Sequence, residues 1–164
     1  DRKLLEKARD NGKAMIVVVN KKDLIDKKTL GEIEKTLDKD SMLNGLPICF
    51  ISAKKKEGIK YLFDNIYRVL ENADKKISTN KLNNVLKKAL ETKSIPFKGK
   101  FRPKIRFVHQ GGKNPHIITI HGNSLEKLEG SYKRFLINFY QKKLGLLGIT
   151  FKLKFITSKN PYKS

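Results

Sequence analysis

The first 74 residues alternate amphipathic helical patterns with short apolar runs. Leu4, Leu5 and Ala8 recur at helical spacing, and Gly12 is well placed to end that helix. The apolar runs are typical of parallel strands covered on both faces. The predicted elements are a helix over 1–11, a strand over 14–20, a helix over 29–39, a strand over 47–51 and a helix over 58–72. This order is half of a doubly wound α/β sheet, so we expect the other half before Asp1.

A different pattern follows residue 74. Ser78 or Thr79 is the predicted N-cap of a helix whose apolar stripe includes Leu82 and Leu86. The other predicted elements are strands over 103–109 and 116–121 around a turn at 110–115, a helix with Leu128, Tyr132, Phe135, Leu136, Phe139 and Tyr140 inward and Gly145 near its end, and a strand over 149–156 with its lysines outward. The second unit is therefore predicted as α-β-β-α-β, a two-layer α+β sandwich with its helices on one face of a small sheet.

Charge separates the same two units. The chain has 37 Lys and Arg against 16 Asp and Glu, a formal net charge of +21. Residues 1–74 hold 16 of the basic and 13 of the acidic side chains, which leaves 21 basic and 3 acidic for residues 75–164. A lysine-rich proteome would load both halves equally. The second unit carries a net +18, which favours a phosphate-rich partner.

Composition excludes several kinds of chemistry. The single Cys49 has no disulfide partner in the chain and is predicted to be a small core residue. No apolar stretch reaches the roughly 18 residues that span a bilayer. The start of the chain does not resemble a signal peptide, so we expect no membrane contact and a cytoplasmic location. Strand alternation puts His116 and His121 on opposite faces, which argues against a metal ion shared by the three histidines. His109, His116 and His121 are therefore expected to be surface or strand-edge residues.

Two short motifs follow the two predicted strands of the first unit. Asn20-Lys21-Lys22-Asp23 comes directly after the first strand, and Ser52-Ala53-Lys54 after the second. Ligands of open α/β sheets bind beyond the carboxyl ends of the strands, so the two loops can close on one ligand. The carboxylate of Asp23 can accept from the N1–H and the exocyclic amine of guanine, a pairing that adenine cannot supply. Asn20 can use its amide on N7 and on nearby backbone.

The remaining motif positions suit the same ligand. The stem of Lys21 can cover the ring face, and the backbone N–H of Ala53 can reach the guanine O6. The pair Asn-Lys-x-Asp and Ser-Ala-Lys resembles the guanine-specificity elements of translation-factor-type GTPases. Continued through the basic second unit, the chain resembles the EngA (Der) family, whose members carry two GTPase domains in tandem and a C-terminal KH-like domain. Residues 76–83 and 130–136 resemble the two helix signatures of that domain.

The resemblance covers essentially the whole chain and implies a fold and a function. The fold is a partial P-loop-GTPase-type doubly wound sheet over 1–74, followed by a KH-like domain over 75–164. The implied function is that of a GTP-binding, GTP-hydrolysing assembly factor for the large ribosomal subunit, with GTP or GDP as ligand and Mg²⁺ bound outside this chain. The implied partners are ribosomal RNA and the other GTPase domain of the parent protein. The implied guanine-binding residues are Asn20, Lys21, Asp23, Ser52, Ala53 and Lys54. Lys22 replaces the Trp that is frequent in the family, and we expect little loss from that.

The chain lacks a phosphate-binding Gly-x-x-x-x-Gly-Lys-Ser/Thr loop, and we predict no catalytic residue within it. We therefore expect weak or no GTP binding and no hydrolysis by residues 1–164 alone.

RNA binding by the second unit is expected to rest on its basic surface. No Gly-x-x-Gly clamp of the usual KH type separates its two predicted helices. Phe97, Phe101 and Phe107 interleave with the charges, where core packing or docking on another domain competes with base stacking. The candidate contacts are Lys81, Lys87, Lys88, Lys98, Lys100, Arg102, Lys104, Arg106, Lys133, Arg134, Lys142, Lys143, Lys152 and Lys154.

Two other classes of function stay open at this point. One is a non-enzymatic, ribosomal-type RNA-binding protein in which Asn-Lys-Lys-Asp is accidental. The other is a protein–protein module whose basic sheet face packs on another domain. A phosphate-binding loop upstream of Asp1 would separate the GTPase from the first of these, and salt-sensitive RNA binding would weigh against the second.

Overall fold

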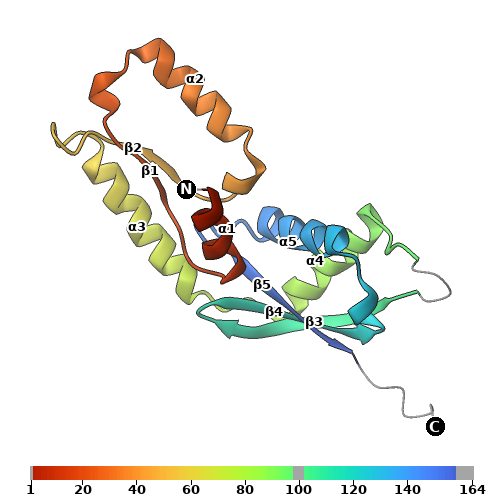
Figure 1. Cartoon of the computed structure of the whole chain (residues 1–164). Helices are drawn as coiled ribbons and strands as arrows, with labels where there is room; N and C mark the ends of the chain where they lie inside the picture. The colour runs from red at the N-terminus through yellow and green to blue at the C-terminus, as the bar shows by residue number, and fades with distance from the viewer. Residues whose placement is uncertain (1, 98–101, 158–164) are drawn as a thin grey trace, which may run out of the picture.

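The computed structural model describes residues 2–97 and 102–157 and confirms the order of elements (Figure 1). The first unit comprises α1 (Arg2–Asp10), β1 (Val17–Val19), the 3₁₀ turn η1 (Lys22–Leu24), α2 (Lys27–Asp38), the 3₁₀ turn η2 (Ser41–Leu43), β2 (Ile48–Phe50) and α3 (Ile59–Asp74). The second unit comprises α4 (Thr79–Thr92), β3 (Lys104–Lys113), β4 (His116–Asn123), the 3₁₀ turn η3 (Leu125–Lys127), α5 (Gly130–Leu144) and β5 (Phe151–Thr157).

The first unit is a two-stranded parallel sheet with helices around it. Val17 pairs with Ile48 and Val19 with Phe50, so both strands end at the same edge. Cys49 is fully buried, as predicted, and burial raises the pKa of its thiol. The prediction that β1 is covered on both faces is wrong, because Val18 is 44% exposed. Two strands and the surrounding helices leave too little material for a closed core.

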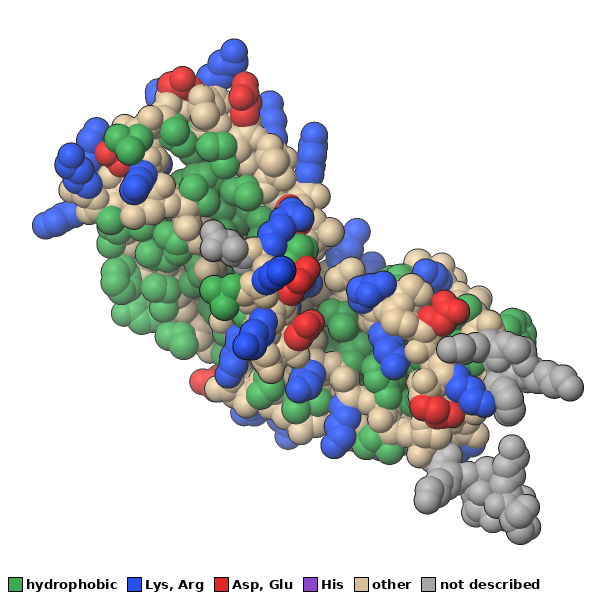
Figure 2. All heavy atoms as spheres, in the orientation of Figure 1, with side chains coloured by type: hydrophobic (Ala, Val, Ile, Leu, Met, Phe, Trp, Pro, Cys, Tyr) green, Lys and Arg blue, Asp and Glu red, His purple; other side chains and the backbone are tan. Residues whose placement is uncertain are grey.

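Apolar side chains of α3 are exposed for the same reason. Figure 2 shows hydrophobic side chains gathered over the first unit. Those on α3 that are more than half exposed are Tyr61, Phe63, Tyr67 and Leu70. Their exposure agrees with a sheet that is only partly present in this chain.

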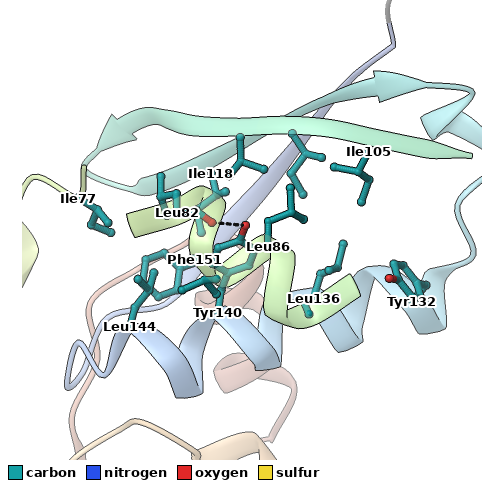
Figure 3. Packing of buried hydrophobic residues seen from close by; sticks show 14 of the residues in the cluster. Ile77, Leu82, Leu86, Ile105, Ile118, Tyr132, Leu136, Tyr140, Leu144 and Phe151 are labelled. Atoms are coloured by element: carbon teal, nitrogen blue, oxygen red, sulfur yellow. Dashed lines mark hydrogen bonds between the residues drawn. The ribbon is translucent and has the colours of Figure 1, made fainter. Parts of the chain in front are cut away.

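The second unit has the predicted α-β-β-α-β order. Its sheet has the strand order β3-β4-β5, with β3 antiparallel and β5 parallel to β4. Both helices cover one face of this sheet (Figure 3). The side chain of Ser78 caps α4 by accepting from the N–H of Lys81 at 3.2 Å, and Gly145 ends α5 with a φ of 61°.

The hydrophobic core lies between that sheet and the two helices. Leu82 and Leu136 are fully buried there beside Tyr140. The Tyr140 hydroxyl donates to the carbonyl of Leu82 at 3.1 Å, which satisfies the one polar group that this ring brings into the core. Burial raises the pKa of both Tyr140 and Tyr132.

The β3–β4 hairpin differs from the prediction. Residues 110–113, predicted as part of the turn, continue β3, and the connection is reduced to Asn114 and the following Pro115, joined by a cis peptide bond. The register shifts between Gln110 and Gly112, so Gly111 occupies a bulge. A side chain at Gly111 would collide with Thr119 on β4, which explains why glycine is accommodated inside a strand there.

The two units are joined by backbone hydrogen bonds around Gly148. Its N–H donates to the carbonyl of Gly45 at 2.7 Å, and its own carbonyl accepts from the N–H of Met15 at 2.8 Å. The hydroxyl of Thr150 donates to the carbonyl of Lys13 at 2.9 Å. The loop between α5 and β5 thus adds hydrogen bonds to the first unit, which makes the connection more than a flexible linker.

Asn72, near the end of α3, supplies a second set of junction contacts. Its side chain donates to the carbonyl of Leu147 at 3.1 Å, and its carbonyl lies 3.2 Å from Nε2 of His116. The other ring nitrogen of His116 lies 3.1 Å from Nε2 of Gln110, whose Oε1 accepts from the N–H of Ile77. His116 is therefore a buried junction residue, which corrects the prediction that it lies at the surface or at a strand edge.

Candidate guanine-binding site and basic surface

The two motif loops lie together at the carboxyl edge of the first sheet. Asn20 follows β1, and Ser52 follows β2 by one residue. The N–H of Ile51 donates to the carbonyl of Val19, and the N–H of Lys22 donates to the carbonyl of Ile51. These bonds continue the sheet pairing past the ends of the strands and hold the two loops side by side.

Asn20 connects the two loops directly. Its Oδ1 accepts from the backbone N–H of Lys21 at 2.7 Å and from the backbone N–H of Ala53 at 3.1 Å. The side-chain amide nitrogen keeps its donor capacity for an acceptor such as a purine N7. The Ala53 N–H, which the sequence assigns to the guanine O6, is donated to Asn20 in this structure.

Ser52 and Asp23 form the second connection between the loops. Ser52 is fully buried, and its hydroxyl oxygen accepts from the N–H of Lys55 at 3.1 Å. Hydrogen bonding to the Ser52 side chain lowers the pKa of Asp23, and the nearby charges of Lys55 and Lys54 lower it further against partial desolvation. Asp23 is therefore an ionised hydrogen-bond acceptor at neutral pH.

The lysines of the loops have different surroundings. Lys21 is exposed and adopts a left-handed backbone conformation, with a φ of 67°. The ammonium group of Lys22 forms an ion pair with the carboxylate of Glu57 at 3.4 Å. The backbone of Glu57 in turn pairs with that of Ser52. Lys54 is exposed on the loop after β2.

The basic side chains of the second unit are spread over both layers. Most of the candidate contacts are exposed, and Lys133 is half-buried, with its ammonium group 5.1 Å from the ring centre of Phe155. Lys98, Lys100 and Phe101 lie outside the described residues. The exposed candidates on the helices are Lys81, Lys87, Lys88, Arg134, Lys142 and Lys143, and those on or beside the sheet are Arg102, Lys104, Arg106, Lys152 and Lys154.

Lys133 and Arg134 also line a cleft between the two units. The cleft has a volume of about 510 Å³ and includes Arg9 of α1 together with the acidic Glu6 and Asp10. Its mixed charge distinguishes it from the uniformly basic strands.

One Gly-x-x-Gly sequence does occur, from Gly145 to Gly148, in the loop between α5 and β5. Its Leu146 is buried, and the backbone of Gly148 is bonded to the first unit. This loop is therefore part of the junction and is not a free clamp for a nucleic-acid backbone. Only the spacing of the two glycines could have drawn attention to it in the sequence.

Residues 2–97 and 102–157 contain neither a candidate metal cluster nor a candidate membrane-spanning helix. No group of three or more His, Cys, Asp or Glu side chains there is placed to hold a metal ion. None of the helices in these ranges has the length and apolarity needed to cross a membrane.

Both units match known protein families. Residues 76–155 match the model of the KH-domain-like C-terminal region of EngA bacterial GTPase enzymes. Residues 1–72 match the model of the elongation factor Tu GTP-binding domain. The chain is thus part of a GTP-binding domain joined to a KH-like domain.

Curated relatives combine the two matches. Proteins named GTPase Der are 40% identical over 154 residues in Acidovorax ebreus (strain TPSY), 40% over 163 residues in Thioalkalivibrio sulfidiphilus (strain HL-EbGR7) and 37% over 158 residues in Neisseria meningitidis serogroup C. These matches cover 93%, 99% and 96% of this chain. The chain belongs to the EngA (Der) family of GTPases. It spans about a third of the length of these relatives, with 34%, 35% and 33% covered.

Proposed function

We propose that this chain is the guanine-recognising and RNA-docking part of a GTP-hydrolysing factor for assembly of the large ribosomal subunit. In this proposal residues 1–74 belong to a GTPase domain and read the base, and residues 75–164 dock on ribosomal RNA. Hydrolysis, Mg²⁺ binding and the phosphate contacts fall to residues outside this chain, because it has no phosphate-binding loop. A factor that docks on ribosomes would work in the cytoplasm.

The observation that carries the proposal is the double hydrogen bond to Oδ1 of Asn20. By accepting from both Lys21 and Ala53, this one atom fixes the spacing between the two loops. A chance Asn-Lys-Lys-Asp turn has no need for a side chain that bonds a second motif 33 residues away. A preorganised pair of loops lowers the ordering cost of binding a flat ligand between them.

Asp23 supplies the proposed specificity. An ionised carboxylate beside the base accepts the N1–H and the exocyclic amine of guanine, which are two donors that adenine does not present together. A site built to hydrogen-bond a group can reject a ligand that lacks the group by roughly 10⁴-fold. Ser52 supports this role, because hydrogen bonding to its side chain lowers the pKa of Asp23 below the ordinary value.

Charge supports the second part of the proposal. The net +18 of residues 75–164 predicts binding to polyanions that falls steeply as salt increases. Ribosomal RNA supplies the phosphates, and the other GTPase domain of a parent protein is the second proposed partner. A ribosomal-type RNA-binding protein would share the charge but has no use for the guanine loops.

The base-reading test uses Asp23→Asn in a longer protein in which a phosphate-binding loop precedes residues 1–164, with any second nucleotide site disabled. An amide at position 23 presents a donor to the base, so preference is expected to move from GDP to xanthosine diphosphate. Asp26→Asn is the matched control, because Asp26 caps α2 by accepting from Thr29 at 2.7 Å and asparagine is an equally good cap. Unchanged affinity of the Asp23 variant for both nucleotides would rule out the base-reading role.

The docking test measures binding of residues 1–164 to ribosomal RNA over a range of salt concentrations. Each phosphate contact contributes a slope of roughly −0.9 to −0.7 to log K against log salt, so several contacts should give a slope of several units. A slope near zero would remove ribosomal RNA as the partner.

A further inference from the structure

A row of stacked rings lies on the face of the second unit's sheet that is opposite α4 and α5. Phe107 and His121 are register partners on β3 and β4, with ring centres 4.5 Å apart and planes inclined by only 6°. His109 stacks on His121 at 5.0 Å and 27°. Three rings from two strands therefore form a continuous stack, with His121 in contact with both of the others.

The stack is separate from the hydrophobic core. Strand alternation places the buried Val108 and Ile120 on the helix side, and their neighbours Phe107 and His121 on the opposite side. Phe107 is 47% exposed although it is a large apolar ring, and Ile156, which pairs with His121 from β5, is 37% exposed. A ring that was needed only for packing would be placed on the covered side.

The charge of this sheet is of one sign. β3, β4 and β5 contain no Asp or Glu. The exposed cations of these strands near the stack are Lys104 on β3, Lys154 on β5, and Arg106, which lies in the register shift between Ile105 and Phe107. The three carboxylates of the second unit, Glu91, Glu126 and Glu129, lie on α4, on η3 and at the start of α5. An exposed aromatic ring on strands whose only charged side chains are cations complements a ligand that has flat rings and negative charges in alternation.

We propose that this sheet face binds single-stranded RNA, with a base stacking on the Phe107–His121–His109 ladder and flanking phosphates paired with the lysines and arginine of β3 and β5. Every base has a π-face, so the site accepts any sequence but requires an unpaired base. The inference rests on the proposed RNA docking and adds to it a place and a mode of recognition. An acidic protein surface is the competing occupant of the same face.

The test uses residues 1–164 and the absence of tryptophan from the sequence. Phe107→Trp places a single fluorophore in the ladder, and Phe63→Trp places one on α3 at a position of similar exposure, 52% against 47%. Titration with an unstructured RNA 12-mer should quench the fluorescence of the Phe107→Trp variant and leave that of the Phe63→Trp variant nearly unchanged. A duplex of the same length should quench neither variant, because its bases are already stacked.

Affinity measurements separate stacking from charge. Phe107→Ala should weaken binding of the single strand by about 5- to 160-fold, the loss typical of one base–aromatic stack, with an unchanged salt slope. Lys154→Ala should instead reduce the salt slope by roughly one. Matching thermal melts for wild type and Phe107→Ala would show that folding is intact, and quenching in the Phe107→Trp variant tests the proposal even if the alanine variant does not fold.

The outcomes distinguish this inference from the function on which it rests. Salt-dependent RNA binding with no quenching in Phe107→Trp and no loss of affinity in Phe107→Ala would overturn the stacking site and keep the docking function. Equal quenching of the Phe107→Trp variant by duplex and single strand would also overturn it. The absence of any salt-dependent RNA binding by residues 1–164 would remove both.

Discussion

Replacement of Gly148 by alanine tests whether the two units are packed together as the structure has them. Gly148 has a φ of 74°, and a Cβ at this position would overlap a methyl group of Val69 and lie 3.0 Å from the carbonyl oxygen of Met15. Gly145, three residues earlier, has a similar φ of 61° but nothing within 4 Å of an added Cβ. The two glycines therefore share a backbone conformation and differ only in their surroundings.

The expected magnitudes follow from this difference. Alanine in the left-handed region costs about 1–2 kcal/mol at either position. Gly148→Ala adds the overlap with Val69 on α3, and overpacking of this kind costs roughly 1–3 kcal/mol more. For a chain of 164 residues that extra loss corresponds to a Tm lower by roughly 2–12 °C than that of Gly145→Ala.

Thermal and urea unfolding of the two variants, followed by circular dichroism, measure the difference. Val69→Ala in the Gly148→Ala background provides an internal check, because removal of the two methyl groups should recover part of the overlap cost in a double-mutant cycle. If Gly148→Ala and Gly145→Ala destabilise the chain equally, and the effect of Val69→Ala is additive, Gly148 does not pack against Val69 and the proposed packing of the two units is wrong.

Three further predictions concern single side chains. Asp23, whose pKa is lowered chiefly by Ser52, should stay ionised as pH falls below the ordinary carboxyl pKa of 3.8, and an NMR titration of Ser52→Ala should show that pKa rising towards its ordinary value. Tyr140→Phe should cost about 1 kcal/mol in urea unfolding through the lost hydrogen bond. Because burial raises the pKa of Tyr140 in the folded state, the contribution of its neutral hydroxyl to the free energy of unfolding is complete below the ordinary pKa of 10 and is lost at higher pH. The wild type should therefore lose more stability than Tyr140→Phe between pH 9 and 11. Ser78→Ala should cost about 1 kcal/mol by removing the cap of α4, measured by the same unfolding assay.

Periodicity predicted the helices and the sandwich well because those patterns are local. The alternation of residues 149–156 places Lys152 and Lys154 outward and Phe151 inward, and burial in the structure follows it. Whether β1 is buried on both faces could not be predicted in the same way. An apolar run shows that cover is required, but the cover itself comes from other strands and helices.

The hairpin and His116 show where local patterns fail. Two adjacent glycines indicate a turn, but a bulge within a strand needs the same freedom, and only the pairing of β3 with β4 separates the two interpretations. His116 was expected at the surface or at a strand edge. Its burial depends on the end of α3, which reaches it from 44 residues earlier in the chain.

The candidate site was predictable in its residues but not in its internal bonds. The motifs named Asn20, Asp23 and Ser52 as neighbours of one ligand. That Asn20 bonds the backbone of Ala53, and that Ser52 bonds Asp23, depends on how far each loop extends past its strand. The ring stack on the second sheet was missed because its members come from two strands whose register was not known in advance.

Helix α3 connects the motif loops of the first unit to the junction with the second unit. The helix starts after Gly58, where an added Cβ would lie 2.5 Å from the carbonyl oxygen of Phe50, so its first turn is held close to β2 and to the loop that carries Ser52. It ends at Asp74, just beyond Asn72, whose bonds to Leu147 and His116 join it to the second unit. The 16 helical residues span about 24 Å along this element. The one helix α3 therefore lies against the loop that carries Ser52 at its start and is bonded to the second unit near its end.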